Sequence, residues 1–432
     1  MRRLIVIRLI VTLIILAAPS LSSSGEETRR TVYVGSYEGV INPVAAEYIA
    51  HVLSEAQAGG ATAVVIRLDT PGGLDTSMRV AIKNITSSPV PVIVYIAPSG
   101  GRAASAGVFI LYAAHIAAMA PGTNVGAAHP VAMGGEMDAT MKTKVENDAA
   151  AYIKSIAEKR GRNVQWAEEA VRKSVSVTEK EALNLKVIDL IAEDVPSLLA
   201  AVDGREVTTG AGKTVLRTKG AAVKEVPMGW RMEALKVLSD PNIAFLLMTI
   251  GTIGLLAELY NPGAILPGIV GAISLILAMY SLQTLPISYA GVLLILLGIV
   301  LFVLEIKVMS YGLLSLGGLA ALVLGALMLV KTDAPFLKVS LSFIIPTAIT
   351  FGAILMTLTW IALKSQRRSP VSGIESMIGD IAIAKTDLAP RGTVLVHGEL
   401  WEAVSDEPIR QGEEAEVKSV AGLTLRVARR RR

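Results

Sequence analysis

Apolar and polar positions alternate in short blocks over residues 30–200, and these blocks favour a mixed α/β fold. The runs 31–35, 63–68 and 92–96 are rich in Val, Ile and Tyr, which is typical of strands. The segments between them, 42–58 and 75–85, space their apolar residues as helices do. Strands that alternate with helices form mainly parallel sheets with right-handed crossovers. We therefore predict a largely parallel α/β core.

Local signals mark the ends of two predicted helices. Asn42 followed by Pro43 is typical of an N-cap and a first helical position, because the asparagine accepts a free N–H and proline needs no partner. A longer helical pattern covers residues 137–159 and is followed by Gly161, which suits a glycine C-cap. We expect the first helix to begin, and the second to end, at these residues.

Five apolar stretches follow this region, at roughly residues 243–259, 264–284, 287–306, 309–330 and 341–363. About twenty helical residues span the hydrocarbon core of a bilayer, so the last four are long enough and the first is marginal. A soluble core could bury one such run, but not five in succession. We predict a polytopic α-helical membrane bundle of about five helices.

Residues 374–427 return to a soluble pattern. Two segments, 378–385 and 392–398, alternate apolar and polar residues as half-buried strands do, and Gly and Pro turns separate them. This pattern favours a small all-β barrel of five strands, of the OB type. The expected organisation is 1–24 signal peptide, 25–202 α/β domain, 203–242 linker approaching the membrane, 243–363 membrane region and 372–432 barrel.

The N-terminus is typical of a secretory signal peptide, with an uncut first anchor as the alternative. Three arginines among the first eight residues flank a short apolar run, and small residues follow it up to Ser24. The α/β domain is then expected outside the cytoplasm. Five spans would put the tail inside, beside Lys364, Arg367 and Arg368, as the positive-inside rule favours. If the first stretch is only re-entrant, the tail lies outside.

The amino-acid composition excludes several kinds of active site. The chain has no cysteine, which excludes a thiolate nucleophile and a disulfide framework, and its four histidines lie far apart. We therefore expect no metal site and no cofactor. Apolar residues make up 52% of the chain, mostly in the membrane region, and the net charge of +4 discriminates little. The basic ending 429–432 suits a solvated tail near a membrane surface better than a nucleic-acid contact.

The strongest chemical candidate is Ser105, which stands at the predicted start of a helix after a buried strand. The helix dipole and unpaired N–H groups there favour developing negative charge. The glycines Gly72 and Gly73 lack a Cβ, so their N–H groups can approach a bound carbonyl and form an oxyanion hole with the N–H of Ala106. The purely structural alternative is that Ser105 only caps its helix.

A serine needs a base, and two residues are candidates. His129 lies 24 residues after Ser105, and Lys144 lies on the long predicted helix. A lysine serves only if desolvation leaves its amine neutral. Asn147 and Asp148 share its helical face and could orient it, although an ionised Asp148 would favour the charged amine. Spacing alone does not choose between the two bases.

The motifs together resemble the NfeD family of membrane-bound serine proteases. The matching segments are LDTPGG (68–73), RAASAG (102–107), MAPGTNVGAAHP (119–130), KVEND (144–148), DLAPRGTV (387–394) and GELWEA (398–403). The resemblance covers nearly the whole chain. It implies a ClpP/crotonase-like protease domain, a membrane bundle and a C-terminal OB domain.

The resemblance also implies the roles of the site residues. Ser105 is then the nucleophile and Lys144 the general base of a Ser-Lys dyad, provided that Lys144 and not Lys142 aligns with the motif. Gly72, Gly73 and Ala106 would form the oxyanion hole. His129 falls near the position of the histidine in soluble Clp peptidases and remains the alternative base.

The implied function is a membrane-anchored serine endopeptidase that cleaves hydrophobic segments of stomatin-type membrane proteins. The implied partners are such a protein, membrane lipid and further copies of the chain, and no nucleic acid. The rival is a catalytically silent membrane scaffold that partners stomatin-like assemblies. Acyl-CoA chemistry is disfavoured because an exported domain would not meet CoA.

Overall fold

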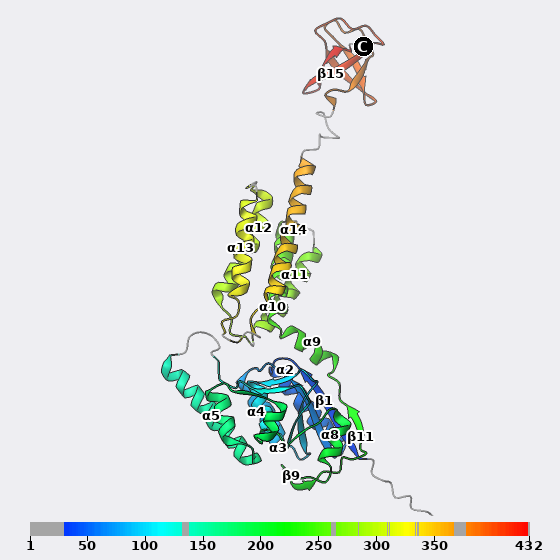
Figure 1. Cartoon of the computed structure of the whole chain (residues 1–432). Helices are drawn as coiled ribbons and strands as arrows, with labels where there is room; N and C mark the ends of the chain where they lie inside the picture. Colours follow the sequence, from blue (N-terminus) through cyan, green and yellow to red (C-terminus); the bar gives the residue numbers. More distant parts are fainter. Residues whose placement is uncertain are drawn as a thin grey trace, which may run out of the picture. The chain divides into compact units, whose positions relative to one another are not determined.

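A computed structural model describes residues 30–131, 138–260, 265–283, 285–308, 310, 312–332, 334, 337–366 and 377–430 (Figure 1). The expected signal peptide lies outside the described residues. The N-terminal elements are β1 (Thr31–Glu38), α2 (Pro43–Ala58), β2 (Ala63–Asp69), α3 (Asp75–Ser87), β3 (Val92–Ile96), β4 (Arg102–Ala104), α4 (Ala106–Ala113), β5 (Ile116–Met119), β6 (Asn124–Gly126), α5 (Ala139–Arg160), α6 (Val164–Arg172), β7 (Ser176–Thr178), α7 (Glu179–Asn184), β8 (Leu190–Ile191) and α8 (Val195–Val202). After them come β9 (Glu206–Thr209), β10 (Gly212–Val215), β11 (Ala222–Glu225) and α9 (Trp230–Leu238).

The α/β domain is built on a parallel sheet, as the alternation of blocks predicts. Its strand order is β11-β1-β2-β3-β5-β8, and every neighbouring pair is parallel. A three-stranded sheet, β4-β6-β7, stands beside it, and β9 and β10 form a hairpin. The predicted strand β3 has the bounds expected from sequence. The pairing of β11 with β1 was not foreseen from the pattern.

Apolar residues on the two faces of the sheet are buried in two separate clusters, because successive strand residues point to opposite faces. Val64 and Ile66 pack with α2 to α6, whereas Val65 packs with α8. The strands are therefore covered on both sides, which explains their continuous apolar runs. The site described below lies on the face covered by α3, α4 and α5.

The predicted helix ends are found in the structure. Asn42 Oδ1 accepts a hydrogen bond from the N–H of Ala45 at 2.9 Å, and Pro43 is the first residue of α2. Helix α5 begins after Asp138, whose carboxylate accepts from the N–H of Met141 at 2.8 Å. It ends at Gly161 with φ 66°, the left-handed conformation that glycine adopts without strain.

Five apolar helices occupy the five predicted apolar stretches: α10 (Pro241–Tyr260), α11 (Ile265–Leu282), α12 (Tyr289–Lys307), α13 (Leu313–Leu327) and α14 (Leu341–Gln366). Among the described residues two spans, Pro241–Leu259 and Ile265–Leu282, are long and apolar enough to cross a membrane by length and composition. The first stretch, expected to be marginal, thus qualifies because its helix begins at Pro241. The apolar parts of α12, α13 and α14 are shorter, so a bundle of five spans stays a prediction.

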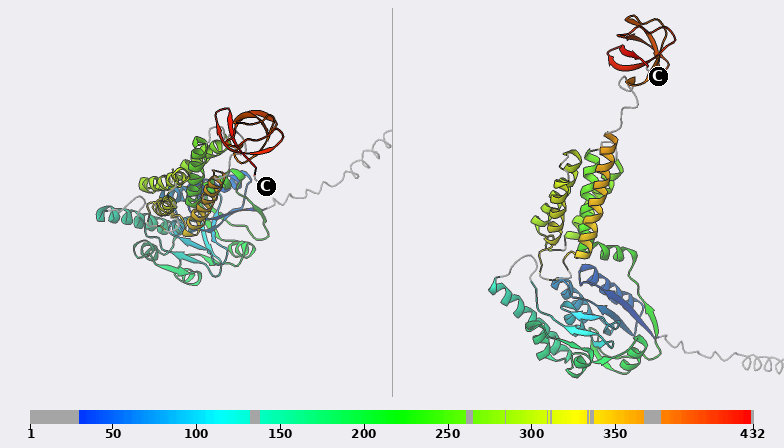
Figure 2. Two further views of the ribbon diagram at one scale, coloured as in Figure 1. Left: turned by 90° about the horizontal axis from the view of Figure 1, so that it is seen from above. Right: turned by 45° about the horizontal axis from the view of Figure 1, so that its top comes forward.

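The C-terminal region is a small closed barrel, as predicted (Figure 2). Its strands are β12 (Ile381–Ala384), β13 (Arg391–Val396), β14 (Glu399–Val404), β15 (Glu414–Ala421) and β16 (Thr424–Arg429). The order β12-β13-β14-β16-β15 closes through the antiparallel pair β12 and β15. Alternate residues such as Ala382, Val394 and Val417 fill the interior. The barrel is OB-like, with its own core.

Candidate active site

Ser105 stands between β4 and α4 in a conformation that is rare for a residue with a side chain. Its φ is 51° and its ψ is −114°, a backbone geometry that favours glycine. Within the described part of the chain, its side chain makes no capping hydrogen bond to α4. Such strain costs about 1–3 kcal/mol and persists only where the surroundings enforce it. Ser105 therefore occupies the N-cap position without acting as a cap.

The LDTPGG motif supports the segment that carries Ser105. The Asp69 carboxylate accepts from the N–H of Arg102 at 2.9 Å. Thr70 pairs its main chain with β4, accepting from the N–H of Ala104 at 3.0 Å. A Cβ on Gly107 would lie 2.6 Å from the Thr70 methyl group, so α4 can approach this turn only with glycine there. The aspartate and threonine of the motif thus have supporting roles that sequence reasoning missed.

The three expected oxyanion donors differ in availability. The N–H of Gly72 donates to Thr70 Oγ1 at 3.0 Å and is already engaged. Gly73 and Ala106 both line a pocket beside Ser105. Gly73 packs so closely on Ile41 that a Cβ would lie 2.1 Å from the Ile41 carbonyl oxygen. Gly73 and Ala106 therefore remain the candidate oxyanion donors among the residues that line the pocket.

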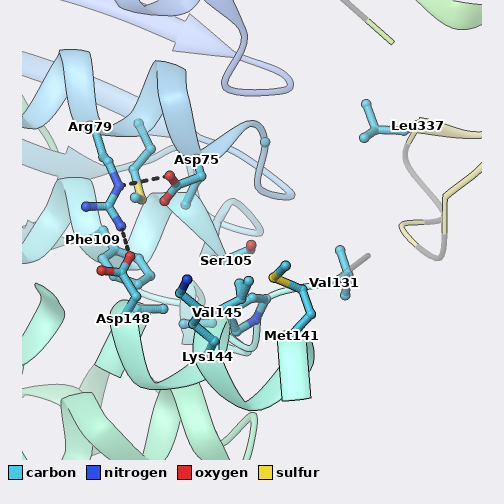
Figure 3. Close-up of a pocket in the computed structure, with 16 residues that line it drawn as sticks. Asp75, Arg79, Ser105, Phe109, Val131, Met141, Lys144, Val145, Asp148 and Leu337 are labelled. Atoms are coloured by element: carbon cyan, nitrogen blue, oxygen red, sulfur yellow. Dashed lines mark hydrogen bonds and ion pairs between the residues drawn. The ribbon is translucent and has the colours of Figure 1, made fainter. Parts of the chain in front are cut away.

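Ser105 and Lys144 line one pocket of about 400 Å³ (Figure 3). Ser105 comes from the start of α4 and Lys144 from the second turn of α5. Figure 3 shows the Lys144 side chain rising from α5 into the space beside Ser105. Most of the remaining wall is apolar: Met78, Phe109, Ala128, Pro130, Val131, Met141, Val145, Ala149 and Leu337. Lys142, two residues earlier, does not line this pocket.

The residues expected to orient Lys144 are held by arginines. Asp148 Oδ2 accepts from Arg79 Nη2 at 2.5 Å, and Asn147 Oδ1 accepts from Arg172 Nη1 at 2.9 Å. Lys144 itself is exposed. Asp148 and Asn147 are therefore both engaged by arginines of other helices.

Arg79, on α3, also lines the pocket of Ser105 and Lys144. It bridges two carboxylates, with Nε donating to Asp75 at 2.8 Å and Nη2 donating to Asp148 (Figure 3). Its guanidinium also lies 4.3 Å from the centroid of the Tyr152 ring. The Asp75–Arg79 pair is a local i,i+4 contact within α3, but no local signal predicts the pairing of Arg79 with Asp148, 69 positions away.

His129, the alternative base, is held elsewhere. Its Nδ1 lies 2.8 Å from the carbonyl oxygen of Val171, and the imidazole is partly buried. A ring nitrogen facing a carbonyl donates its proton, so the hydrogen bond fixes the tautomer with the proton on Nδ1. His129 is not among the residues that line the pocket with Ser105 and Lys144.

Comparison with known proteins places the chain in a family. Consecutive parts match the NfeD1b N-terminal domain (residues 31–221), the NfeD integral membrane domain (242–361) and the NfeD-like C-terminal, partner-binding domain (374–429). The chain is 33% identical over 444 residues to the membrane-bound protease PH1510 of Pyrococcus horikoshii, which covers 100% of this chain and 99% of that protein. The chain belongs to the NfeD family. The predicted resemblance is confirmed, and the chain is a membrane protein.

A second NfeD relative is the membrane protein NfeD1b of Bacillus subtilis, which is 28% identical over 398 residues and covers 88% of each chain. Among solved structures, a lysine-to-alanine mutant of the 1510-N membrane-bound stomatin-specific protease with a substrate peptide is 32% identical, with a TM-score of 0.45. It covers 48% of this chain and 96% of that chain. The C-terminal domain of the stomatin operon partner protein 1510-C from Pyrococcus horikoshii is 43% identical, with a TM-score of 0.14. The match covers 14% of this chain and 98% of that chain.

Proposed function

We propose that this NfeD-family chain is a membrane-bound serine endopeptidase in which Ser105 is the nucleophile and Lys144 the general base. The observation that carries the proposal is the shared pocket. A strained serine whose side chain does not cap its helix, a lysine, a glycine of the Pro-Gly-Gly turn and the first residue of α4 line one cavity of about 400 Å³. These are the parts that acyl transfer needs: a nucleophile, a base and oxyanion donors.

The reaction follows from these positions. Ser105 Oγ attacks the scissile carbonyl carbon while its proton passes to Lys144 Nζ. The N–H groups of Gly73 and Ala106 stabilise the oxyanion that forms. Collapse of the tetrahedral intermediate breaks the C–N bond, and the leaving amine takes the proton from Lys144. Water then attacks the acyl-enzyme with Lys144 again as base, which releases the acid and restores Ser105.

Because Lys144 is exposed, the bound substrate has to help convert Lys144 into a base. A charged amine cannot accept the serine proton, and a solvated one is stabilised in that form. An apolar peptide bound along Val145 and Met141 would cover the amine and remove its water. Desolvation favours the neutral amine, so binding prepares the base. The site is then inactive toward small polar esters and active on apolar peptides.

The apolar walls of the pocket support a hydrophobic peptide substrate. Phe109 and Met78 form its inner part, and Val131 and Met141 are 45% and 46% exposed at its rim. Solved relatives are described as specific for stomatin or a stomatin homologue. We carry this over as the proposed substrate class: a hydrophobic segment of a stomatin-type membrane protein, bound as an added strand.

The test uses the full-length protein in lipid nanodiscs with peptides from hydrophobic C-terminal segments. Ser105→Ala and Lys144→Ala are expected to reduce cleavage by more than about 1000-fold, since both act in one unit. Lys142→Ala, on the same helix but outside the pocket, and His129→Ala are the matched controls and keep activity. Loss of cleavage in His129→Ala with retention in Lys144→Ala would move the base to His129.

A second function is favoured by one observation. The barrel matches a domain described as partner-binding, and none of the described residues of this domain lines the Ser105 pocket. A chain that only organises stomatin-type assemblies would keep the barrel and need no dyad. Absence of cleavage by the wild type together with specific binding to a stomatin-type partner would favour this scaffold. Under either function we propose an extracytoplasmic α/β domain, a cytoplasmic barrel and homo-oligomers.

A further inference from the structure

A second pocket, of about 420 Å³, lies farther along the same two helices that hold the candidate active site. From α3 the first pocket takes Asp75, Met78 and Arg79, and the second takes the later residues Ile82, Lys83, Thr86 and Ser87. From α5 the first takes residues between 141 and 149, and the second takes residues between 152 and 160. Helix α4 contributes Ala106 and Phe109 to the first and Ala113 to the second. The two pockets therefore lie one after the other along α3 and α5, and we call the two together the groove.

The boundary between the pockets is the stack of Arg79 on Tyr152. The guanidinium lies 4.3 Å from the ring centroid and is ion-paired with Asp75 and Asp148, both on the side of the first pocket (Figure 3). Arg79 is thus paired with two carboxylates, and the three groups together carry a net negative charge. Its charge does not extend into the second pocket, which makes the two halves of the groove electrically different.

The second pocket is positively charged and has no carboxylate in its wall. Its charged lining residues are Lys83, Lys159 and Arg160, accompanied by the hydroxyls of Thr86 and Ser155. Among the described residues, no carboxylate lies within ion-pair distance of these three cations. Three full charges outweigh the partial negative charges of the helix ends nearby.

Arg160 is fixed in place with donor capacity to spare. Its Nε donates to the carbonyl of Ala113 at 2.9 Å and its Nη1 to that of Thr208 at 3.2 Å. Its Nη2 is buried and has no partner within the described part of the chain. Capping of α4 explains the first bond but not the free nitrogen. A buried, unpaired guanidinium nitrogen is unfavourable unless an acceptor reaches it.

We propose that this second pocket is a subsite for an acidic group of the peptide substrate, a glutamate or aspartate side chain or a terminal carboxylate. The inference rests on the proposed protease function, because the peptide occupies both halves of the groove. The apolar half beside Ser105 takes a hydrophobic residue, and the cationic half takes the carboxylate. Cleavage is therefore selective for apolar segments with an acidic residue at a fixed distance.

The helix geometry sets that distance. The second pocket begins about seven residues farther along α3, or about 11 Å at a rise of 1.5 Å per residue. An extended peptide covers about 3.3 Å per residue, so the carboxylate lies about three residues from the apolar residue in the first pocket. Peptides with glutamate two, three or four residues to either side of the apolar anchor locate it.

The experiment measures binding and cleavage separately on the full chain in nanodiscs. The probes are fluorescent apolar peptides with glutamate at each of these positions, each with a matched glutamine peptide. Binding is measured by titrating the peptides onto the Ser105→Ala variant, and cleavage by digesting them with the wild type. We expect the best glutamate peptide to bind about fivefold or more tightly than its glutamine match, and added salt to reduce this difference. The double variant Lys83→Gln, Lys159→Gln abolishes the preference.

The matched control is the double variant Lys142→Gln, Lys154→Gln, which removes two exposed lysines of α5 that do not line the second pocket. It keeps the glutamate preference. Equal binding of glutamate and glutamine peptides at all positions, or a preference that survives loss of Lys83 and Lys159, overturns the subsite. A glutamate preference in binding without any cleavage by the wild type supports the subsite and overturns the protease instead.

Discussion

Several helices of the α/β domain begin after a polar residue, and two of them, α2 and α4, use that residue in different ways. At α2, Asn42 has φ −118° and accepts the N–H of Ala45, which satisfies one of the free donors at the helix start. At α4, Ser105 has φ 51° and makes no side-chain capping bond in the described structure. The first arrangement stabilises the fold. The second is strained and leaves a hydroxyl available to a pocket.

The strain at Ser105 is imposed by its neighbours. On one side the N–H of Ala104 donates to Thr70, and on the other the N–H of Ser105 donates to the carbonyl of Gly126 at 3.2 Å. These bonds hold the main chain as it turns from β4 into α4. A sharp strand-to-helix turn that exposes a serine is a recurring way to present a nucleophile. A polar residue before a helix therefore shows its role only through the backbone geometry.

The largest expected effect comes from replacing Ser105 with glycine. Ser105→Gly accepts the positive φ without strain, so the stability of the protein rises by about 1 kcal/mol. Proteolytic activity falls by more than about 1000-fold because the nucleophile is lost. Thermal unfolding and peptide cleavage are measured on the same preparation.

Ser105→Ala is the control for this exchange, because it removes the hydroxyl and keeps the strain. It abolishes cleavage without the gain in stability. If Ser105→Gly is less stable than wild type, the hydroxyl contributes to the fold in a way that the geometry does not show, and the contrast with Asn42 fails.

A second prediction separates the acid sensitivity of the fold from that of the site. His115 is buried beside Val92, whose N–H donates to its Nδ1 at 3.1 Å. Burial, and then the charges of Arg160, Arg162 and Lys159, lower the pKa of His115 from 6.5 to about 3. The folded protein therefore keeps this imidazole neutral where the unfolded chain would protonate it.

The sign follows from proton linkage. Between about pH 6.5 and pH 3 the unfolded state binds more protons, so stability falls as the pH falls and is fully present above about 6.5. The loss is up to about 1.4 kcal/mol per pH unit. His115→Gln keeps an acceptor for Val92 and should flatten this slope. Melting temperatures of the two proteins are measured from pH 7.5 to 5 by the fluorescence of buried Trp166. The change in their difference with pH gives the contribution of His115.

A constant difference over that pH range would contradict the assignment to His115. The result also bears on the active site. A loss of cleavage below pH 6.5 that disappears in His115→Gln belongs to the fold, and one that remains belongs to the Ser105 pocket.

The parts of the fold that local rules determine could be predicted from sequence. Strand β3 has the expected bounds, and both Asn42 and Gly161 cap their helices, because cap and strand preferences depend on a few neighbouring residues. Ser105 was recognised as the start of a helix for the same reason. The positive φ of Ser105 could not be predicted, because it is imposed by hydrogen bonds to the carbonyls of Thr70 and Gly126, which lie in distant segments.

Long-range contacts explain what sequence reasoning missed. Strand β11 pairs with β1 although almost the whole domain separates them in sequence. Arg79 joins Asp75 to Asp148, and the cationic pocket joins Lys83 to Lys159. Apart from the i,i+4 pair of Asp75 and Arg79, no local pattern marks these contacts. The membrane helices show the opposite limit: their apolar runs were located by composition, but composition alone did not determine how many of them cross the bilayer.

The smallest expected effect tests the comparison from the side of Asn42. Asn42→Ala removes the acceptor for the N–H of Ala45 and costs about 1 kcal/mol of stability, as loss of an N-cap usually does. Asn42 does not line the Ser105 pocket, so cleavage of an apolar peptide should stay within about twofold of wild type at a temperature where both proteins are folded. Asn42→Ser, which can still cap, recovers most of the stability.

A large loss of cleavage in Asn42→Ala would show that the start of α2 also positions Gly73, which packs against Ile41 directly before Asn42. The two helix starts would then be parts of one site, because capping at the first would set the oxyanion donor used at the second.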